Sequence, residues 1–177
     1  MPNILRGPRL ALRRGMPEDA GTLTAILGEP EVARWWGNSD ADEVAEHFVD
    51  RDGAFVIDVD GRVIGAIQCE EEEDPMYRHA GIDLFISSSH WGHGYGSEAV
   101  RTLARHLFTD RAHHRLSIDP AADNERAIRT YEAVGFRRVG VLRRYERAPD
   151  GTWRDGLLMD LLVDEFRDHP GEGGGHR

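Results

Sequence analysis

Apolar residues change their spacing several times along the chain, and these changes predict alternating helices and strands. In the N-terminal third, Leu23, Ile26 and Leu27 recur at helical spacing, whereas apolar and basic residues alternate before them as in a strand. The elements predicted here are a strand over residues 9–14 and helices over residues 16–28, 31–36 and 41–49.

Two strands joined by a tight turn are predicted next, because Asp60 and Gly61 supply the positive φ angles of a primed hairpin turn. These strands cover residues 54–59 and 62–69. The acidic stretch Glu70–Asp74 favours a solvated loop, with a cation-attracting rim as the second interpretation. The apolar run over residues 79–87 predicts a further strand that leads into a glycine-rich segment.

The C-terminal half continues with helix, strand and helix before two long strands. The predicted elements are a helix with apolar residues from Ala99 to Phe108, a strand over residues 115–119, a helix capped by Asp123 or Asn124 and ended by Gly135, and strands over residues 136–147 and 152–162. Only the unit from His79 to Asp119 requires a parallel crossover. We therefore expect an α/β (α+β) fold with a central mixed, mostly antiparallel sheet flanked by helices, and one parallel crossover at the glycine-rich segment.

Length and composition predict a single domain over residues 1–169 and a disordered tail over residues 170–177. No apolar run reaches the roughly 20 residues of a membrane span, so no membrane is expected as a partner. The single cysteine, Cys69, excludes an internal disulfide, favours a cytoplasmic location and is expected to pack as a small apolar residue. The net charge of −10 argues against a nucleic-acid partner and fits a cationic substrate.

The segment HWGHGYGSEAV, residues 90–100, has three glycines at alternating positions between a strand and a helix. Bare backbone at a helix N-terminus favours a phosphate site, because the first N–H groups of the helix lack partners. A P-loop is excluded, because no lysine lies near the glycines. A dinucleotide site fits poorly, because its doubly wound sheet needs several parallel crossovers. A glycine-rich turn without a ligand and a loop for the pyrophosphate of coenzyme A stay open.

Two segments resemble the GNAT superfamily of N-acetyltransferases, and the likeness extends over nearly the whole chain. The family's loop pattern Q/RxxGxG/A corresponds to WGHGYG, residues 91–96, with Trp91 in place of the usual Arg or Gln. Glu98 and Ala99 then continue as in a branch with the pattern WGxGYxxEA. SIDPAADNERAIRTYEAVGF, residues 117–136, resembles the family pattern DPxxxNxxAIxxYExxGF.

This resemblance implies acetyl-CoA as the co-substrate and no metal. The phosphates of the coenzyme would be held mainly by backbone N–H groups of the loop. The cofactor-binding residues expected on this basis are Ile86, Trp91, Gly92, His93, Gly94, Tyr95, Gly96, Ser97 and Asn124.

Amide formation from a thioester needs a neutral amine and a stabilised leaving thiolate. Asp83 is the candidate catalytic base, because it is an acid in an otherwise apolar strand that leads to the loop, where burial would raise its pKa. The alternative is an exposed residue on the other face of that strand. Tyr131 is the candidate catalytic donor to the thiolate, and N–H groups near Ile86 would polarise the acetyl carbonyl.

The Trp35-Trp36-Gly37 segment, together with the two family-like segments, resembles the aminoglycoside 6′-N-acetyltransferases. This likeness implies a small cationic amine as substrate, bound by Trp35, Trp36, Asp83 and Asp119, with either tryptophan able to serve as a core residue instead. Ribosomal-protein-type N-terminal acetyltransferases and siderophore hydroxylysine acyltransferases share parts of the pattern. A non-catalytic acyl-CoA-binding module is the alternative from another class. A monomer or homodimer is expected.

Overall fold

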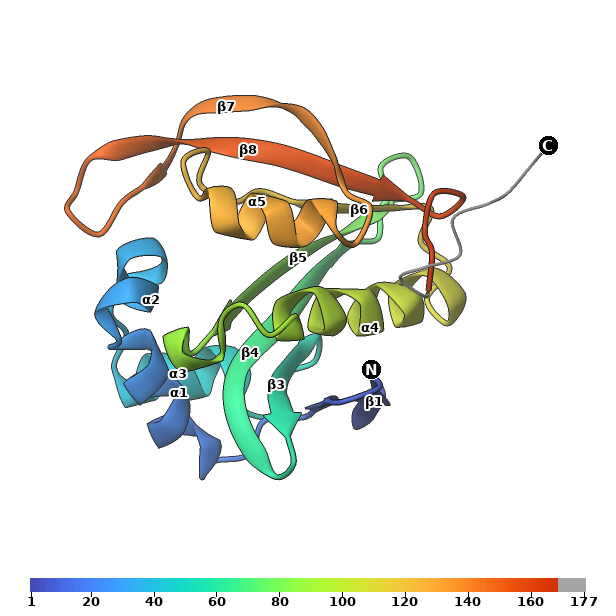
Figure 1. The fold of residues 1–177 in the computed structure, drawn as a ribbon. Coiled ribbons are helices and arrows are strands. Elements are labelled where there is room, and N and C mark those ends of the chain that lie inside the picture. The colour runs from blue at the N-terminus through green and yellow to red at the C-terminus, as the bar shows by residue number, and fades with distance from the viewer. Residues whose placement is uncertain (169–177) are drawn as a thin grey trace.

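Eight strands form one twisted sheet in the computed structural model, which describes residues 1–168 (Figure 1). The strands are β1 (Ile4–Arg6), β2 (Ala11–Arg13), β3 (Ala54–Val59), β4 (Arg62–Glu72), β5 (His79–Ile86), β6 (Arg115–Ile118), β7 (Arg137–Arg147) and β8 (Trp153–Leu162). Across the sheet they lie in the order β1-β2-β3-β4-β5-β6-β8-β7. The tail predicted over residues 170–177 lies outside the described residues.

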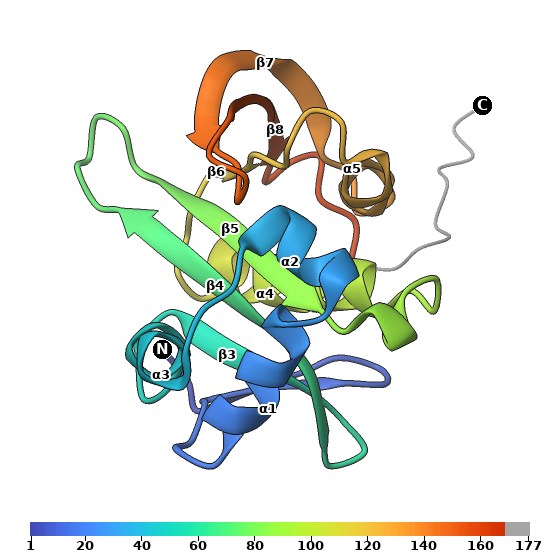
Figure 2. The same cartoon turned by 90° about the vertical axis from the view of Figure 1, so that its left-hand side faces the viewer.

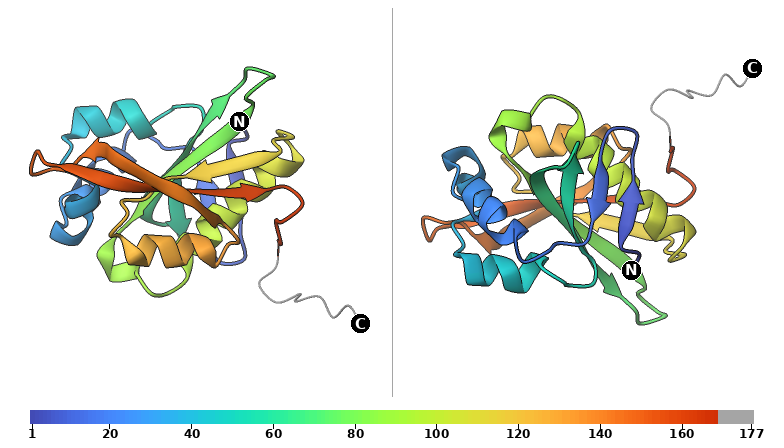
Figure 3. Two further views of the ribbon diagram at one scale, coloured as in Figure 1. Left: turned by 90° about the horizontal axis from the view of Figure 1, so that it is seen from above. Right: turned by 90° about the horizontal axis from the view of Figure 1, so that it is seen from below.

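Helices cover both faces of this sheet (Figures 2 and 3). They are α1 (Asp19–Leu27), α2 (Pro30–Trp36), α3 (Ala41–Phe48), α4 (Tyr95–Thr109) and α5 (Glu125–Glu132). The first three share a core with Val56 and Phe85, whereas α4 and α5 share the opposite core with Ile57 and Leu84. Because side chains alternate along a strand, neighbouring residues of β3 and of β5 contribute to the two separate cores.

The one parallel pair of neighbours in the described sheet is β5 and β6, which confirms the predicted mixed, mostly antiparallel fold. Two residue pairs join these strands, Ala80 with Leu116 and Gly81 with Ser117. β5 nevertheless stays paired with β4 on its other edge as far as Ile86. The two parallel strands therefore separate toward their C-terminal ends, and within residues 1–168 the edge of β5 beyond Gly81 has no strand partner on that side.

Two predicted boundaries were wrong. The strand predicted over residues 9–14 is only β2, and the sequence pattern missed β1, because three-residue strands carry too few alternating positions to be seen. The acidic stretch predicted as a loop begins inside a strand, because β4 continues through Glu72 in register with β5. The Glu71 carboxylate in this extension is 3.0 Å from Arg111 and 2.6 Å from His113, so its charge is compensated within the fold.

Local predictions in the β3–β4 hairpin are confirmed. Asp60 and Gly61 form its turn with φ angles of 51° and 79°. Cys69 is buried in β4, and burial is the main cause that raises the pKa of its thiol to about 12, as expected for a packed side chain. Within residues 1–168, no helix is both long enough and apolar enough to cross a membrane.

Candidate functional site

A cavity of about 580 Å³ lies where β5 and β6 separate. Its walls come from α2, the end of β5, the glycine loop with the start of α4, and the chain from the end of β6 through α5. Every site residue predicted from the sequence lines it except His93: the lining includes Trp35, Trp36, Asp83, Ile86, Trp91, Gly92, Gly94, Tyr95, Gly96, Ser97, Asp119, Asn124 and Tyr131. His93 is exposed, and its backbone carbonyl accepts a hydrogen bond from Arg9.

The cavity is bordered by groups from both faces of the sheet. Along β5, Leu84 and Ile86 belong to the core beneath α4 and α5, whereas Phe85 belongs to the core beneath α1–α3. Asp83 therefore points to the same face as Phe85, the face that α2 covers. Tyr131 reaches the cavity from α5 on the opposite face. Two ligands that entered from opposite faces would meet between Asp83 and Tyr131.

The glycine loop owes its conformation to two of its glycines. Gly92 and Gly94 have φ angles of 78° and 80°, a region that side chains with a Cβ rarely adopt. Gly96 packs closely against α5, because a Cβ there would lie 3.2 Å from the Thr130 methyl group. No side chain caps the N-terminus of α4 at Gly94, so the first N–H groups of this helix are available to an anion.

Trp91 fastens the loop to the end of β5. Its indole Nε1 donates a hydrogen bond of 2.8 Å to the carbonyl oxygen of Ile86. The guanidinium of Arg126, on α5, lies 3.1 Å from the centre of the indole ring. Trp91 thus has a structural role where the family pattern has Arg or Gln, and Arg126 brings a positive charge to the same place. Burial lowers the pKa of Arg126.

Asn124 positions α5, and through it Tyr131. The Asn124 side chain is buried and accepts a hydrogen bond from the N–H of Ala127, which caps the helix as predicted. Tyr131 is 6% exposed, and its hydroxyl takes part in no hydrogen bond among the described residues. Burial, and after it the charge of Asp83, raises the pKa of Tyr131 well above its usual value, so this group stays protonated and can donate.

Asp83 is exposed to solvent and lines the cavity. Protein atoms crowd around this position, and the resulting desolvation is the largest cause that raises the pKa of Asp83 to about 7. The nearby charge of Asp119 raises it further, while the N–H of Leu84, 3.0 Å from the carboxylate, acts against the rise. A carboxyl group with this pKa can accept a proton near neutral pH.

The unpaired edge of β5 offers a backbone donor to the cavity. The N–H of Ser87 donates to the carbonyl of Ile64 on β4. Because such hydrogen-bonded positions alternate along an antiparallel ladder, the N–H groups of Leu84 and Ile86 point away from β4, toward the space that β6 has left. The N–H of Leu84 already donates to the Asp83 carboxylate, so the N–H of Ile86 is the donor that a ligand can use. Both residues line the cavity.

Glu29 holds α2 across the end of β5. Its carboxylate accepts hydrogen bonds from the Ser87 hydroxyl, at 2.7 Å, and from the Ser88 N–H, at 2.6 Å. On the helix so placed, Trp36 packs edge-on against Phe85 with a centroid distance of 5.1 Å. Trp36 is therefore partly a core residue, one of the two roles that the sequence left open for the pair.

Trp35 has a different environment, among arginines at the cavity wall. The guanidinium of Arg154, on β8, lies 5.6 Å from the Trp35 ring and donates to the Trp35 carbonyl oxygen at 2.6 Å. Arg154 also forms an ion pair of 2.7 Å with Glu146 of β7. This ion pair compensates the charge of Glu146 and leaves Asp83 and Asp119 as the acids of this wall.

Asp119 follows β6 directly and is exposed at the cavity. It accepts a hydrogen bond of 2.7 Å from the hydroxyl of Tyr145, on β7, and this bond is the main cause that raises the pKa of Tyr145 to about 12. Among residues 1–168, no group of three or more His, Cys, Asp or Glu side chains is placed to hold a metal ion.

Several residues of the site were not found from the sequence: Arg9, Glu29, Arg126, Tyr145, Glu146 and Arg154. Each is a polar residue in a segment whose sequence pattern predicts only a solvent-exposed face or turn. Tyr145, Glu146 and Arg154 reach the cavity or its rim because the sheet brings β7 and β8 beside β6. Arg9 and Glu29 reach the site through contacts with the glycine loop and with the end of β5. The one local signal was Arg126, which lies inside the segment that resembles the family pattern.

The comparisons with known proteins agree with this geometry. The acetyltransferase (GNAT) domain matches residues 9–137. Aminoglycoside N(6′)-acetyltransferase type 1 from Klebsiella pneumoniae is 32% identical over 164 residues, which is 80% of this chain and 79% of the relative.

Two solved structures share the fold over most of the chain. AAC(6′)-Ib in complex with paromomycin and acetyl-CoA has a TM-score of 0.71 and 28% identity, covering 89% of this chain and 95% of that one. Mycobacterium smegmatis RimJ in complex with CoA-disulfide has a TM-score of 0.76 and 26% identity, covering 92% and 87%. The chain therefore belongs to the GNAT family of acetyltransferases and is an acyltransferase.

Proposed function

We propose that this acyltransferase moves the acetyl group of acetyl-CoA to a primary amine of a small polycationic acceptor, an amino sugar of the aminoglycoside type. The observation that carries the proposal is the cavity between β5 and β6, which has a carboxyl group of raised pKa on one face and, on the other, a tyrosine whose hydroxyl has no hydrogen-bond partner among residues 1–168. Family membership supports acetyl-CoA as the co-substrate.

The coenzyme would enter from the α4 and α5 face. Its pyrophosphate would lie over the glycine loop, where the N–H groups at the start of α4 are free and the helix dipole favours an anion. The pantetheine arm would follow the unpaired edge of β5, as an added strand does. The acetyl carbonyl would then accept a hydrogen bond from the Ile86 N–H, which stabilises the charge that develops on this oxygen during attack.

The acceptor amine would enter from the α2 face. As an ammonium it has no lone pair, so it must first give a proton to Asp83, directly or through water. The free amine then attacks the thioester carbon, and the C–S bond of the tetrahedral intermediate breaks. Tyr131 is the candidate donor of a proton to the departing thiolate, which leaves as the thiol of coenzyme A. The nitrogen loses its second proton as the amide forms, and this proton restores the Tyr131 hydroxyl, directly or through water.

An acceptor with several ammonium groups fits the acids and aromatic rings of the α2 side. Asp83 and Asp119 would meet two of its charges, and the face of Trp35 would stack on a sugar ring or cation. The net charge of −10 would also attract such a molecule. The similarity to an aminoglycoside N(6′)-acetyltransferase supports this choice.

An acceptor panel tests the proposal. Thiol release from acetyl-CoA would be followed with kanamycin, with a peptide that begins with alanine, and with N6-hydroxylysine. We expect release with kanamycin, together with a product heavier by one acetyl group. Release with the peptide alone would favour an N-terminal acetyltransferase, and release with hydroxylysine alone a siderophore acyltransferase. Binding of acetyl-CoA without any thiol release would make the chain an acyl-CoA-binding module.

Gly94→Val should remove the coenzyme site. A β-branched residue resists a φ of 80°, so the loop would leave the conformation that exposes the N–H groups of α4. We expect the Kd for acetyl-CoA, measured by calorimetry, to rise at least about 10-fold, as for loss of a hydrogen bond to a charged group. Gly140→Val is the matched control, because Gly140 of β7 has an ordinary φ and open space around it. Equal affinity in both variants would place the phosphates elsewhere.

A further inference from the structure

Arg9 contacts the glycine loop from a distant part of the sequence, the turn between β1 and β2. Its Nε forms an ion pair of 2.7 Å with Glu98, and its Nη1 donates to the His93 carbonyl at 3.0 Å. Its guanidinium lies 4.9 Å from the centre of the Tyr95 ring. The Arg9 side chain therefore contacts the loop at His93 and the first turn of α4 at Tyr95 and Glu98.

The turn is held close to α4 by Gly7. A Cβ at Gly7 would lie 2.8 Å from the Thr102 hydroxyl and 3.0 Å from the Glu98 carboxylate. The backbone N–H of Arg9 donates to the same carboxylate at 2.6 Å. Arg9 is thus fixed beside the loop by backbone as well as by its side chain.

The Arg9 side chain also changes the electrostatics at the N-terminus of α4. Glu98 is 8% exposed and lies in the first turn of α4, where its charge would repel a pyrophosphate bound at the same helix end. The Arg9 side chain compensates this charge while remaining 51% exposed. Its Nη2 has no hydrogen-bond partner among the described residues, and it would lie 3.3 Å from a Cβ placed on Gly94.

A second cavity, of about 430 Å³, gives a ligand access to this guanidinium. It shares Gly94, Ser97 and Ala133 with the first cavity, and Arg9, Arg101 and Arg105 also line it. Two acids, Glu98 and Asp168, also line it and pair with Arg9 and Arg105, so the three arginines leave a net positive charge beside the loop.

We propose that Arg9 is a coenzyme-binding residue of this chain: it cancels the charge of Glu98 and presents its free Nη2 to the pyrophosphate of acetyl-CoA. It adds a second side-chain cation at the loop, besides Arg126, which lies over Trp91. This proposal rests on one part of the proposed function, namely that the ligand is acetyl-CoA. It does not depend on which amine accepts the acetyl group.

The test compares donors with and without phosphate. For Arg9→Met, kcat/KM with acetyl-CoA should fall at least about 10-fold, mostly through KM, because a charge-assisted hydrogen bond is lost. With S-acetylpantetheine, which carries no phosphate, the variant and the wild type should agree within about twofold. Equal losses with both donors would show that Arg9 acts only through the shape of the loop, and no loss with either would exclude a role in binding. Both results overturn the proposal.

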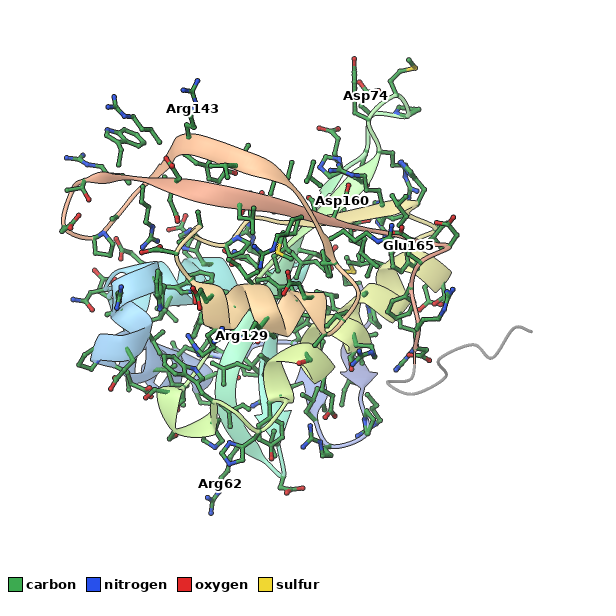
Figure 4. The ribbon with its side chains drawn as sticks, turned by 45° about the horizontal axis from the view of Figure 1, so that its top comes forward. Arg62, Asp74, Arg129, Arg143, Asp160 and Glu165 are labelled. Carbon is green, nitrogen blue, oxygen red and sulfur yellow. The ribbon has the colours of Figure 1, made fainter. Side chains whose placement is uncertain are left out.

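Glu98→Gln separates charge from structure, because it removes the negative charge and leaves Arg9 in place. We expect it to bind acetyl-CoA at least as tightly as the wild type, opposite in direction to Arg9→Met. A loss of affinity in both variants would mean that the ion pair only holds the turn on α4, which contradicts the proposal. Arg62→Met is the matched control, because Arg62 is an exposed arginine at the start of β4, next to the hairpin turn (Figure 4). It should behave like the wild type with both donors.

The Arg9 proposal can be tested even if the chain does not acetylate any of the amines. If the wild type releases no thiol with any amine, calorimetry with free coenzyme A and with pantetheine replaces kinetics. The Arg9 proposal then predicts that Arg9→Met weakens binding of coenzyme A and leaves binding of pantetheine unchanged. Equal effects on the two ligands would overturn it.

Discussion

Asp83→Asn should lower kcat with an amino-sugar acceptor by about 10²–10⁴-fold, the range for loss of a general base. The amide keeps the shape of the side chain but can neither take a proton nor attract a cation. KM for kanamycin should also rise, and more at low salt than at high salt, because screening already weakens the attraction at high salt. Steady-state kinetics at two salt concentrations measures both effects. A peptide with a single α-amine should show the loss of turnover with much less salt dependence.

The pH profile gives the same residue a second test. A base must be deprotonated to act, so kcat/KM of the wild type should rise with pH through the Asp83 pKa of about 7. The Asn variant should lack this limb and keep only the rise that belongs to the amine. An identical limb in the variant would assign the titration to another group.

Stability serves as the control for folding of this variant. The pKa of Asp83 is raised in the folded chain, so the protonated form is favoured there, and the wild type loses stability as pH rises from about 4 through about 7. Asp83→Asn has no such loss. Thermal unfolding at pH 5 and pH 8 should therefore show the variant gaining stability relative to the wild type at the higher pH. A variant less stable than the wild type at both values would make its kinetics uninformative about the base.

Tyr131→Phe should lower kcat with little change in the Kd for acetyl-CoA. The hydroxyl is the candidate donor to the thiolate, and its loss is worth up to about 10²–10⁴-fold when water does not replace it. Tyr131 lines the cavity, so a water that replaces the hydroxyl would make the loss smaller. Single-turnover thiol release measures the chemical step, and calorimetry measures binding.

Tyr77→Phe is the matched control, because it makes the same change on a side chain that is 71% exposed, in the β4–β5 connection. It should leave both quantities unchanged. If turnover of Tyr131→Phe stays within about twofold of the wild type, Tyr131 only packs against Phe136 and its neighbours and has no part in the chemistry.

Local patterns were enough to predict most of the fold. Asp60-Gly61 predicted a hairpin because the turn needs positive φ angles within two residues. The unit from His79 to Asp119 predicted the parallel pair, because a strand, a helix and a strand in succession require a crossover. The boundary errors fall at β1, which is too short to show a period, and at Glu70–Glu72, where pairing to β5 outweighs the polar composition.

Residues of the candidate site were predictable only where they lie in or beside a segment with a recognisable local pattern. The glycine loop, Asp83 and Tyr131 stand in or next to recognisable patterns, and all line the cavity. Tyr145, Glu146 and Arg154 are polar residues of a long hairpin, and nothing local distinguishes them from its solvated positions. Arg9 lies 89 positions from Glu98 in the sequence, so their ion pair is a property of the tertiary fold alone.

A crystal structure with acetyl-CoA tests the central claim most directly, namely that the space between β5 and β6 is the acyl-transfer site. We predict the pyrophosphate over Gly92–Gly96, the acetyl oxygen within hydrogen-bond distance of the Ile86 N–H, and the sulfur near the Tyr131 hydroxyl, with the acetyl carbon open toward Asp83. Density for the thioester outside this space, or β5 and β6 drawn together with the coenzyme bound elsewhere, would contradict the claim.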